Sequence, residues 1–246
     1  MIPSSPSLSH QKNRRDDPLI SFIIPAYSEE KNIEHFLISL TAFLKTLSLR
    51  YELIVIDDGS PDGTPDLIRE IGKNIPLKAL FFSRNFGKEQ ALSAGLRYAS
   101  GEAAILLDSD SQHPLHLIKN FIERWQDGYD MVYGIRETRN EESYVRRSLT
   151  SMFYKLLNLI SKVPIEPNAG DFRILDRKVI DALNKLPERT RFMKGLYSWV
   201  GGLNSLAIPF KADDRLGGKS HYNLRKLSNL AAIGLTSFST LPLRIS

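Results

Sequence analysis

Short apolar runs alternate with longer amphipathic stretches through the first half of the chain, and this alternation limits the fold more than any other feature. The short runs predict strands, because they are brief, rich in Ile, Leu and Val, and end at Pro, Gly or Asp. The stretches between them carry apolar residues every three or four positions and predict helices. Repeated strand–helix–strand units predict an α/β domain with a mainly parallel sheet covered by helices. The expected strands are 19–26, 52–56, 78–82, 103–107 and a weaker 131–133, and the expected helices are 29–47, one opening at Pro61, 87–98 and 114–126.

The second half of the chain is less regular. Residues 145–160 predict an amphipathic helix, and the polar patch 168–173 precedes a helix expected over 177–186. We expect residues 1–18 to form a disordered arm, because they are rich in Ser, Pro and charge and lack an apolar core segment. The expected organisation is therefore this arm, one α/β domain over 19–210, and a segment 211–246 with a basic amphipathic face.

Charge is concentrated in that last segment. It holds six basic and two acidic residues, so it carries +4 of the net charge of +5. A basic amphipathic segment favours contact with phosphates or an anionic membrane surface.

No stretch reaches the roughly 20 mainly apolar residues that a membrane span needs. The chain has no cysteine, which excludes thiolate chemistry and favours a cytoplasmic setting.

Polar clusters follow three of the predicted strands. Tyr27, Ser28 and Glu29 come after the first strand, residues 57–60 after the second, and residues 108–110 after the fourth. Ligands of open α/β sheets bind beyond the carboxyl ends of the strands. The sequence therefore predicts a site built from these three clusters.

Asp108 and Asp110 are the strongest candidates for a metal site. Two carboxylates with the carbonyl of Gln112 form an all-oxygen set, which suits Mg²⁺ or Mn²⁺ better than zinc. Alone, Asp-x-Asp would more often be a solvated turn, but its position after a buried strand favours the metal. Asp57 is expected to accept hydrogen bonds from a base or ribose, whereas Asp58 or Ser60 is expected to form a turn or helix cap.

For other residues the sequence favours a role in packing or surface charge. His113 is expected to pack beside Pro114, and the side chains of Trp125 and Trp199 are expected in the core. The arginines that follow the fifth strand could form a solvated face or an anion site. They are Arg136, Arg139, Arg146 and Arg147.

Several motifs together resemble a known family. They are residues 24–30 (IPAYSEE), 57–60 (DDGS), 84–88 (RNFGK), 108–114 (DSDSQHP), 170–173 (GDFR), 215–222 (RLGGKSHY) and 238–244 (FSTLPLR). In order and spacing they are similar to the family 2 inverting glycosyltransferases, and within these to the polyprenyl-phosphate hexose synthases. The bactoprenol glucosyltransferase branch is most similar, with the dolichyl-phosphate mannose synthases beside it. Family members often have lysine where this chain has His221, and that branch usually continues into two membrane helices.

The resemblance implies a GT-A fold with C-terminal amphipathic juxtamembrane helices and implies roles for individual residues. The nucleoside would lie among Pro25, Tyr27, Glu29 and Asp57. The metal and diphosphate would lie at Asp108, Asp110 and Gln112, with Arg215 near the nucleotide phosphates. Asp171 would lie near the reacting centre, as a base or as an orienting group.

The expected reaction is transfer of a hexose from a nucleotide-sugar to a polyprenyl phosphate, with inversion, at the inner face of the cell membrane. The expected catalytic residues are Asp171, Asp110 and Arg136, and Arg139 and Lys219 are expected to bind phosphates. UDP-glucose is favoured as the donor, and UDP-N-acetylglucosamine and GDP-mannose remain possible donors. A homo-oligomer is also possible. Binding of nucleic acid is not expected. The alternatives are transfer to a saccharide, nucleotidyl transfer, and a non-catalytic nucleotide-binding or membrane-docking subunit.

Overall fold

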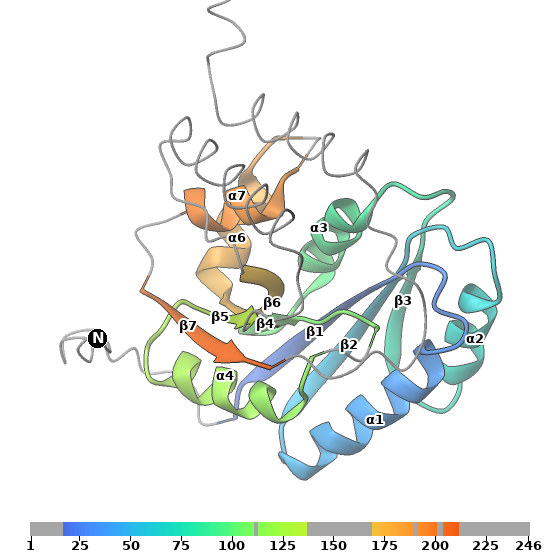
Figure 1. The fold of residues 1–246 in the computed structure, drawn as a ribbon, viewed down its shortest axis with the longest axis horizontal. Helices are drawn as coiled ribbons and strands as arrows, with labels where there is room; N and C mark the ends of the chain where they lie inside the picture. Colours follow the sequence, from blue (N-terminus) through green and yellow to red (C-terminus); the bar gives the residue numbers. More distant parts are fainter. Residues whose placement is uncertain (1–16, 111–112, 137–168, 189–190, 201–203, 212–246) are drawn as a thin grey trace, which may run out of the picture.

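A computed structural model describes residues 17–110, 113–136, 169–188, 191–200 and 204–211. In these residues, one seven-stranded sheet has the order β3-β2-β1-β4-β6-β5-β7 (Figure 1). The strands are β1 (Leu19–Ala26), β2 (Arg50–Asp57), β3 (Leu77–Phe81), β4 (Ala103–Leu106), β5 (Met131–Arg136), β6 (Ala169–Asp176) and β7 (Ser205–Phe210). The helices are α1 (Ile33–Thr46), α2 (Thr64–Ile71), α3 (Lys88–Tyr98), α4 (His116–Gln126), α6 (Arg177–Lys185) and α7 (Met193–Trp199).

The sheet is mixed but mainly parallel. Strand β6 pairs antiparallel with both β4 and β5, and the other strand pairs are parallel. The chain proceeds outward from β1 to β2 and β3, then returns to the other side of β1 for β4. The topological switch point therefore lies between β1 and β4, where ligands of such sheets bind.

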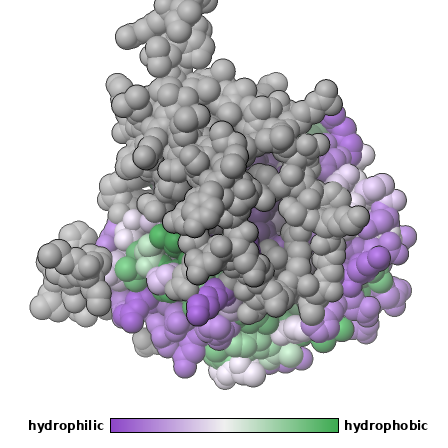
Figure 2. Space-filling model, viewed as in Figure 1, coloured by the Kyte–Doolittle hydropathy of each residue, from purple (hydrophilic) through white to green (hydrophobic). Residues whose placement is uncertain are grey.

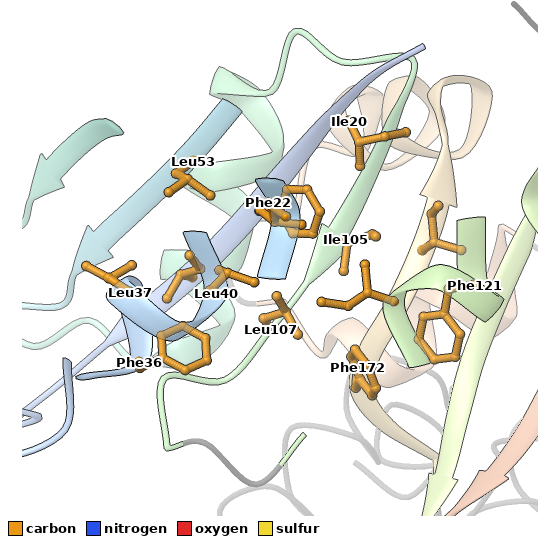
Figure 3. Close-up of a cluster of buried hydrophobic side chains, with 14 of the residues drawn as sticks. Ile20, Phe22, Phe36, Leu37, Leu40, Leu53, Ile105, Leu107, Phe121 and Phe172 are labelled. Carbon is orange, nitrogen blue, oxygen red and sulfur yellow. The ribbon is translucent and has the colours of Figure 1, made fainter. Parts of the chain in front are cut away.

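Helices cover both faces of the sheet. One apolar core joins the sheet to α1, α2 and α4, and its side chains include Phe22, Leu40 and Phe121 (Figure 3). A second core joins the opposite face to α3, α6 and α7 (Figure 1). Full burial of one such side chain contributes about 1.5–3 kcal/mol, so these two layers hold the strand ends in position. Hydrophilic side chains cover the outer surface around α2 and α4 (Figure 2).

The structure confirms the predicted fold and corrects some details. The helix expected to open at Pro61 begins at Thr64, with proline in its first turn. The polar patch before α6 lies in strand β6, which was not expected because Gly170, Asp171 and Arg173 interrupt the apolar pattern. Trp125 is buried as predicted, but Trp199 is 55% exposed at the end of α7.

Parts of the predicted organisation lie outside the described residues. These are the amphipathic helix 145–160, residues 1–16 of the arm, and residues 212–246 of the basic segment. Within the part of the chain that the structure describes, no helix has the length and apolar character needed to cross a membrane.

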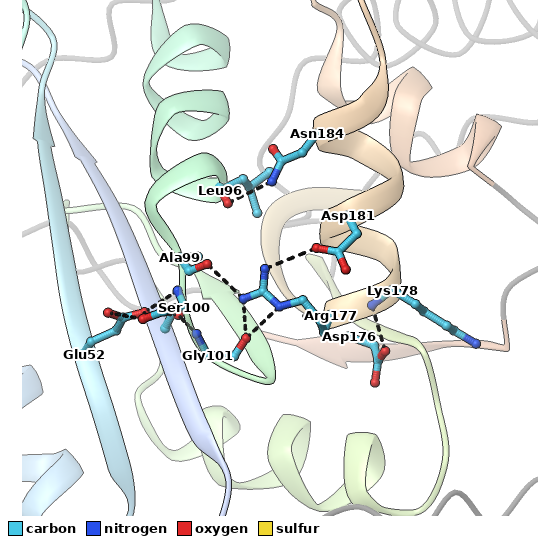
Figure 4. Close-up of polar contacts among 11 residues, drawn as sticks. Glu52, Leu96, Ala99, Ser100, Gly101, Asp176, Arg177, Lys178, Asp181 and Asn184 are labelled. Atoms are coloured by element: carbon cyan, nitrogen blue, oxygen red, sulfur yellow. Dashed lines mark hydrogen bonds and ion pairs between the residues drawn. The ribbon is translucent and has the colours of Figure 1, made fainter.

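Polar side chains tie the strands together at their amino ends (Figure 4). Glu52 accepts hydrogen bonds from the Ser21 hydroxyl at 2.5 Å and the Ser100 amide at 2.7 Å, and pairs with the Lys78 ammonium at 2.6 Å. Burial alone would raise the pKa of Glu52, but these hydrogen bonds outweigh it and lower the pKa to about 2. Arg177 joins α6 to the same edge by donating from Nε to the carbonyl of Gly101 at 2.9 Å.

Candidate active site

The three polar clusters meet at the carboxyl ends of β1, β2 and β4. The amide of Asp58 donates to the carbonyl of Ala26 at 2.9 Å, and the Ser109 hydroxyl donates to the carbonyl of Pro25 at 3.2 Å. Both loops are thereby fastened to the end of β1. Tyr27 follows directly and is 46% exposed, so its ring is available to a ligand.

Glu29 lies where the first loop enters α1. Its amide donates to the Thr64 hydroxyl at 2.9 Å, and its carboxylate accepts from Asn32 Nδ2 at 2.9 Å. Ser28, the residue before it, adopts a positive φ of 55° and donates its amide to the Ser60 hydroxyl. Such strain in a non-glycine residue persists only where surrounding contacts hold it, and here it turns the chain from β1 toward α1.

Asp57 is buried at the end of β2 with one unsatisfied oxygen. Its Oδ2 accepts from the Ser60 amide at 3.2 Å, while Oδ1 is buried and has no hydrogen-bond partner. A buried acceptor without a partner costs about 1–3 kcal/mol, and a ligand donor could remove that cost. The turn predicted for Asp58 or Ser60 is therefore formed by the Asp57 carboxylate with Ser60 as donor.

Asp58 has a different role, which corrects the sequence-based expectation. Its two carboxylate oxygens accept from the amides of Phe86 at 2.8 Å and Gly87 at 2.9 Å. Gly59 has a φ of 67° and lies so close to the backbone of Arg84 that a side chain there would collide. Residues 58 and 59 thus fix the loop that precedes α3.

Lys88 is the first residue of α3 and bridges two acidic residues. Its Nζ lies 2.5 Å from Asp108 Oδ1 and 2.8 Å from Asp171 Oδ2. Burial alone would lower the pKa of Lys88, but the two carboxylates outweigh it and raise that pKa well above its usual value. Burial alone would raise the pKa of Asp171, but Lys88 outweighs it and lowers the pKa to about 2. All three groups are therefore charged at neutral pH.

His113 packs in the core and orients Asp108. Its ring stacks on Phe172 with centroids 4.5 Å apart, and its Nδ1 accepts from the Asp108 amide at 3.2 Å. Burial lowers the pKa of His113, which favours the neutral ring that this hydrogen bond requires. The predicted packing role is confirmed.

Behind Asp171 lies a buried polar cluster. The Arg173 guanidinium carbon is 3.7 Å from the ring centroid of Tyr197, and Glu89 accepts from the Met193 amide at 2.8 Å. Three buried atoms of the cluster have no hydrogen-bond partner. They are Asp171 Oδ1, Arg173 Nε and Tyr197 OH.

Sequence reasoning did not assign this cluster or Lys88. Lys88 and Arg173 stand in motifs that supported the family resemblance, but neither received a role. The available signal for Lys88 was its position directly after Gly87, whose φ is 99°, at the carboxyl edge where the other polar groups lie. No comparable signal marked Glu89 or Tyr197, because they meet Asp171 only through the tertiary fold.

The structure brings most predicted site residues to this one edge. Asp110 follows Asp108 in the same turn, and Asp171 reaches the edge near the start of β6. Arg136 is exposed at the end of β5, also at this edge. Four predicted site residues lie outside the described residues. They are Gln112, Arg139, Arg215 and Lys219.

The donor set suits a metal whose coordination is completed by phosphate. Among the described residues, no group of three or more His, Cys, Asp or Glu side chains could hold a metal ion. Asp108 and Asp110 supply two carboxylates, and Lys88 already places one cationic group on Asp108. Mg²⁺ is commonly bound by one or two carboxylates together with substrate phosphates and water, so these residues fit such an ion.

The sequence of this chain is similar to those of known glycosyltransferases. Residues 21–183 match the model of Glycosyl transferase family 2. The chain belongs to this family. It is 44% identical over 227 residues to the bactoprenol glucosyl transferase of Shigella phage SfV, covering 92% of this chain and 74% of that protein. It is 45% identical over 227 residues to an uncharacterized glycosyltransferase of Synechocystis, covering 92% and 71%.

Solved structures share the fold. A Pyrobaculum calidifontis mannosyltransferase, solved with GDP-mannose and Mn²⁺, has a TM-score of 0.59 at 19% identity, over 83% of this chain and 59% of that one. Glucosyl-3-phosphoglycerate synthase of Mycobacterium tuberculosis, solved with Mg²⁺ and UDP, has a TM-score of 0.61 at 19% identity, over 89% and 78%. The family 2 chain is therefore a glycosyltransferase with the GT-A fold.

Proposed function

We propose that this glycosyltransferase moves glucose from UDP-glucose to a polyprenyl phosphate, with inversion at the anomeric carbon. The observation that carries the proposal is the 44% identity to a bactoprenol glucosyl transferase over 92% of this chain. The strand-end geometry supports it, because Asp57, Asp108 and Asp171 surround the switch point at which a nucleotide-sugar would bind.

The donor half of the reaction rests on the described residues. Asp57 Oδ1 would accept a hydrogen bond from the nucleoside, and Tyr27 would contact its rings or ribose. Asp108 and Asp110 would hold Mg²⁺ or Mn²⁺, which when bound neutralises the diphosphate and stabilises the charge on the departing nucleotide. Arg215 and Lys219 would add positive charge at the same phosphates.

The acceptor half depends on the arginines. The second pKa of a phosphate monoester is about 6, so the acceptor is already mostly dianionic and needs little help from a base. Asp171, whose pKa is held at about 2, is a poor proton acceptor and a good partner for sugar hydroxyls or cationic groups. Arg136 and Arg139 would supply the positive charge that brings a phosphate to this acidic edge.

The membrane part of the proposal concerns the basic segment 211–246. Its charge would hold the enzyme peripherally at the anionic inner leaflet, where the lipid phosphate is presented. Transfer to a saccharide is the competing activity, and it would require neither the arginines nor this segment.

A lipid-extraction assay tests the proposal. The chain is incubated with radiolabelled UDP-glucose, Mg²⁺ and undecaprenyl phosphate in vesicles, and label in the organic phase is counted. We expect lipid-linked glucose in β configuration, with less label from UDP-N-acetylglucosamine and GDP-mannose. Arg136→Ala should raise the acceptor concentration required for half-maximal rate and leave UDP binding unchanged. Label appearing only in a water-soluble saccharide would contradict the proposal.

A further inference from the structure

We propose that the Lys88 ammonium competes with the divalent metal for the Asp108 carboxylate. When the metal binds, Lys88 keeps its ion pair with Asp171. This inference rests on the proposed metal site at Asp108 and Asp110. It assigns a role to Lys88, for which the sequence motifs predicted none.

The competition follows from the position of the ammonium. Lys88 Nζ lies 2.5 Å from Asp108 Oδ1, so one oxygen of this carboxylate is already taken. The other oxygen, Oδ2, lies 3.8 Å from His113 Nε2. A metal at either oxygen would lie within a few ångströms of the ammonium, at a partly buried site where like charges repel strongly. Metal binding must therefore move Lys88 away from Asp108.

Lys88 has the freedom to make that move. Its side chain is 42% exposed, and a lysine ammonium sits on a flexible four-carbon stem with three rotatable donors. Its backbone is fixed instead, because Asp58 holds the two amides directly before it. The contact with Asp171 Oδ2 at 2.8 Å gives the ammonium a second anchor after it leaves Asp108.

Mn²⁺ binding without nucleotide tests the proposal and requires no turnover. Binding is measured at one fixed pH by the loss of the free Mn²⁺ signal in electron paramagnetic resonance. We expect Lys88→Met to bind Mn²⁺ about tenfold more tightly than the wild type, because the competing charge is gone. Lys88→Arg keeps the charge and should bind Mn²⁺ within about threefold of the wild type.

Lys78→Met is the matched control. Lys78 is 51% exposed and lies 2.6 Å from Glu52, so this variant also removes one lysine from a carboxylate, but at the amino ends of the strands. Its Mn²⁺ affinity should equal that of the wild type. Circular dichroism of every variant shows whether the fold is retained, and the Mn²⁺-induced rise in Tm should be larger for Lys88→Met than for wild type.

The outcomes separate this inference from the proposed function. The proposed competition would be wrong if Lys88→Met bound Mn²⁺ no more tightly than the wild type. It would also be wrong if Lys78→Met gained as much Mn²⁺ affinity as Lys88→Met. The metal site itself has a separate test, in which Mn²⁺ binding is measured in the presence of UDP. If the wild type binds Mn²⁺ there and Asp110→Asn does not, the proposed metal site is supported whatever the result for Lys88. If Asp110→Asn binds Mn²⁺ as the wild type does, both proposals fail.

Discussion

Glu52 in β2 and Glu89 in the first turn of α3 lie toward opposite edges of the sheet, and their pKa values are displaced in opposite directions. At the amino ends, burial tends to raise the pKa of Glu52, but its hydrogen bonds lower it to about 2. At the carboxyl ends, burial and the nearby charge of Asp171 raise the pKa of Glu89 to about 7. One glutamate is stabilised as a carboxylate by its partners, whereas burial beside Asp171 favours the neutral form of the other.

The same contrast extends to the groups around them. Glu52 and Arg177 make several hydrogen bonds each, although Asn184 Oδ1 nearby has no partner. At the other end, Asp57 Oδ1, Asp171 Oδ1 and Tyr197 OH are all buried without partners. Satisfied buried groups contribute stability, and unsatisfied ones cost it unless a ligand completes them. We call the amino ends the stabilising end, after these contacts, and the carboxyl ends the binding end, after the proposed site.

The largest expected effect comes from the binding end. Asp110→Asn should lower kcat by about 10³-fold or more, because a neutral amide is a poor ligand for the metal ion that we propose at this residue. Thermal unfolding should stay close to that of the wild type, since Asp110 lies in a partly exposed turn. Full activity of the variant in a metal-dependent assay would refute the metal assignment.

A medium effect is expected at the stabilising end. Glu52→Gln should lower the free energy of unfolding by about 1–2 kcal/mol at neutral pH, after allowing for solvent screening. The folded-state pKa is lowered from 4.5 to about 2, so this loss should shrink as pH falls through that window. Denaturant unfolding at several pH values measures it, with kcat per folded molecule unchanged. A large fall in kcat would break the division between the two ends.

The smallest expected effect concerns the pH dependence of Glu89. Its folded-state pKa is raised from 4.5 to about 7, so the folded state holds a proton that the unfolded state releases. The resulting stability is present at low pH and is lost as pH rises through 7. Relative to Glu89→Gln, the wild type should lose about 1 kcal/mol of unfolding free energy between about pH 6 and pH 8. A pH-independent difference would show that Glu89 does not titrate there.

Sequence patterns predicted the frame of the site better than its interior. The strand ends after Ala26, Asp57 and Leu106 were predictable because apolar periodicity and local turn residues mark them. The contacts of Lys88 with Asp108 and Asp171 were not, because they join positions 20 and 83 residues apart. Strand β6 was missed for a related reason: Gly170, Asp171 and Arg173 break the apolar alternation by which a strand is detected.

The antiparallel direction of β6 has a consequence for how the candidate site is assembled. Because β6 runs against β4 and β5, its first residues lie at the edge where those two strands end. Asp171 therefore reaches the Lys88 ammonium from the start of a strand, whereas Asp57 closes β2 and Asp108 follows β4. A parallel β6 would instead place Asp171 at the opposite edge of the sheet, on the side of Glu52.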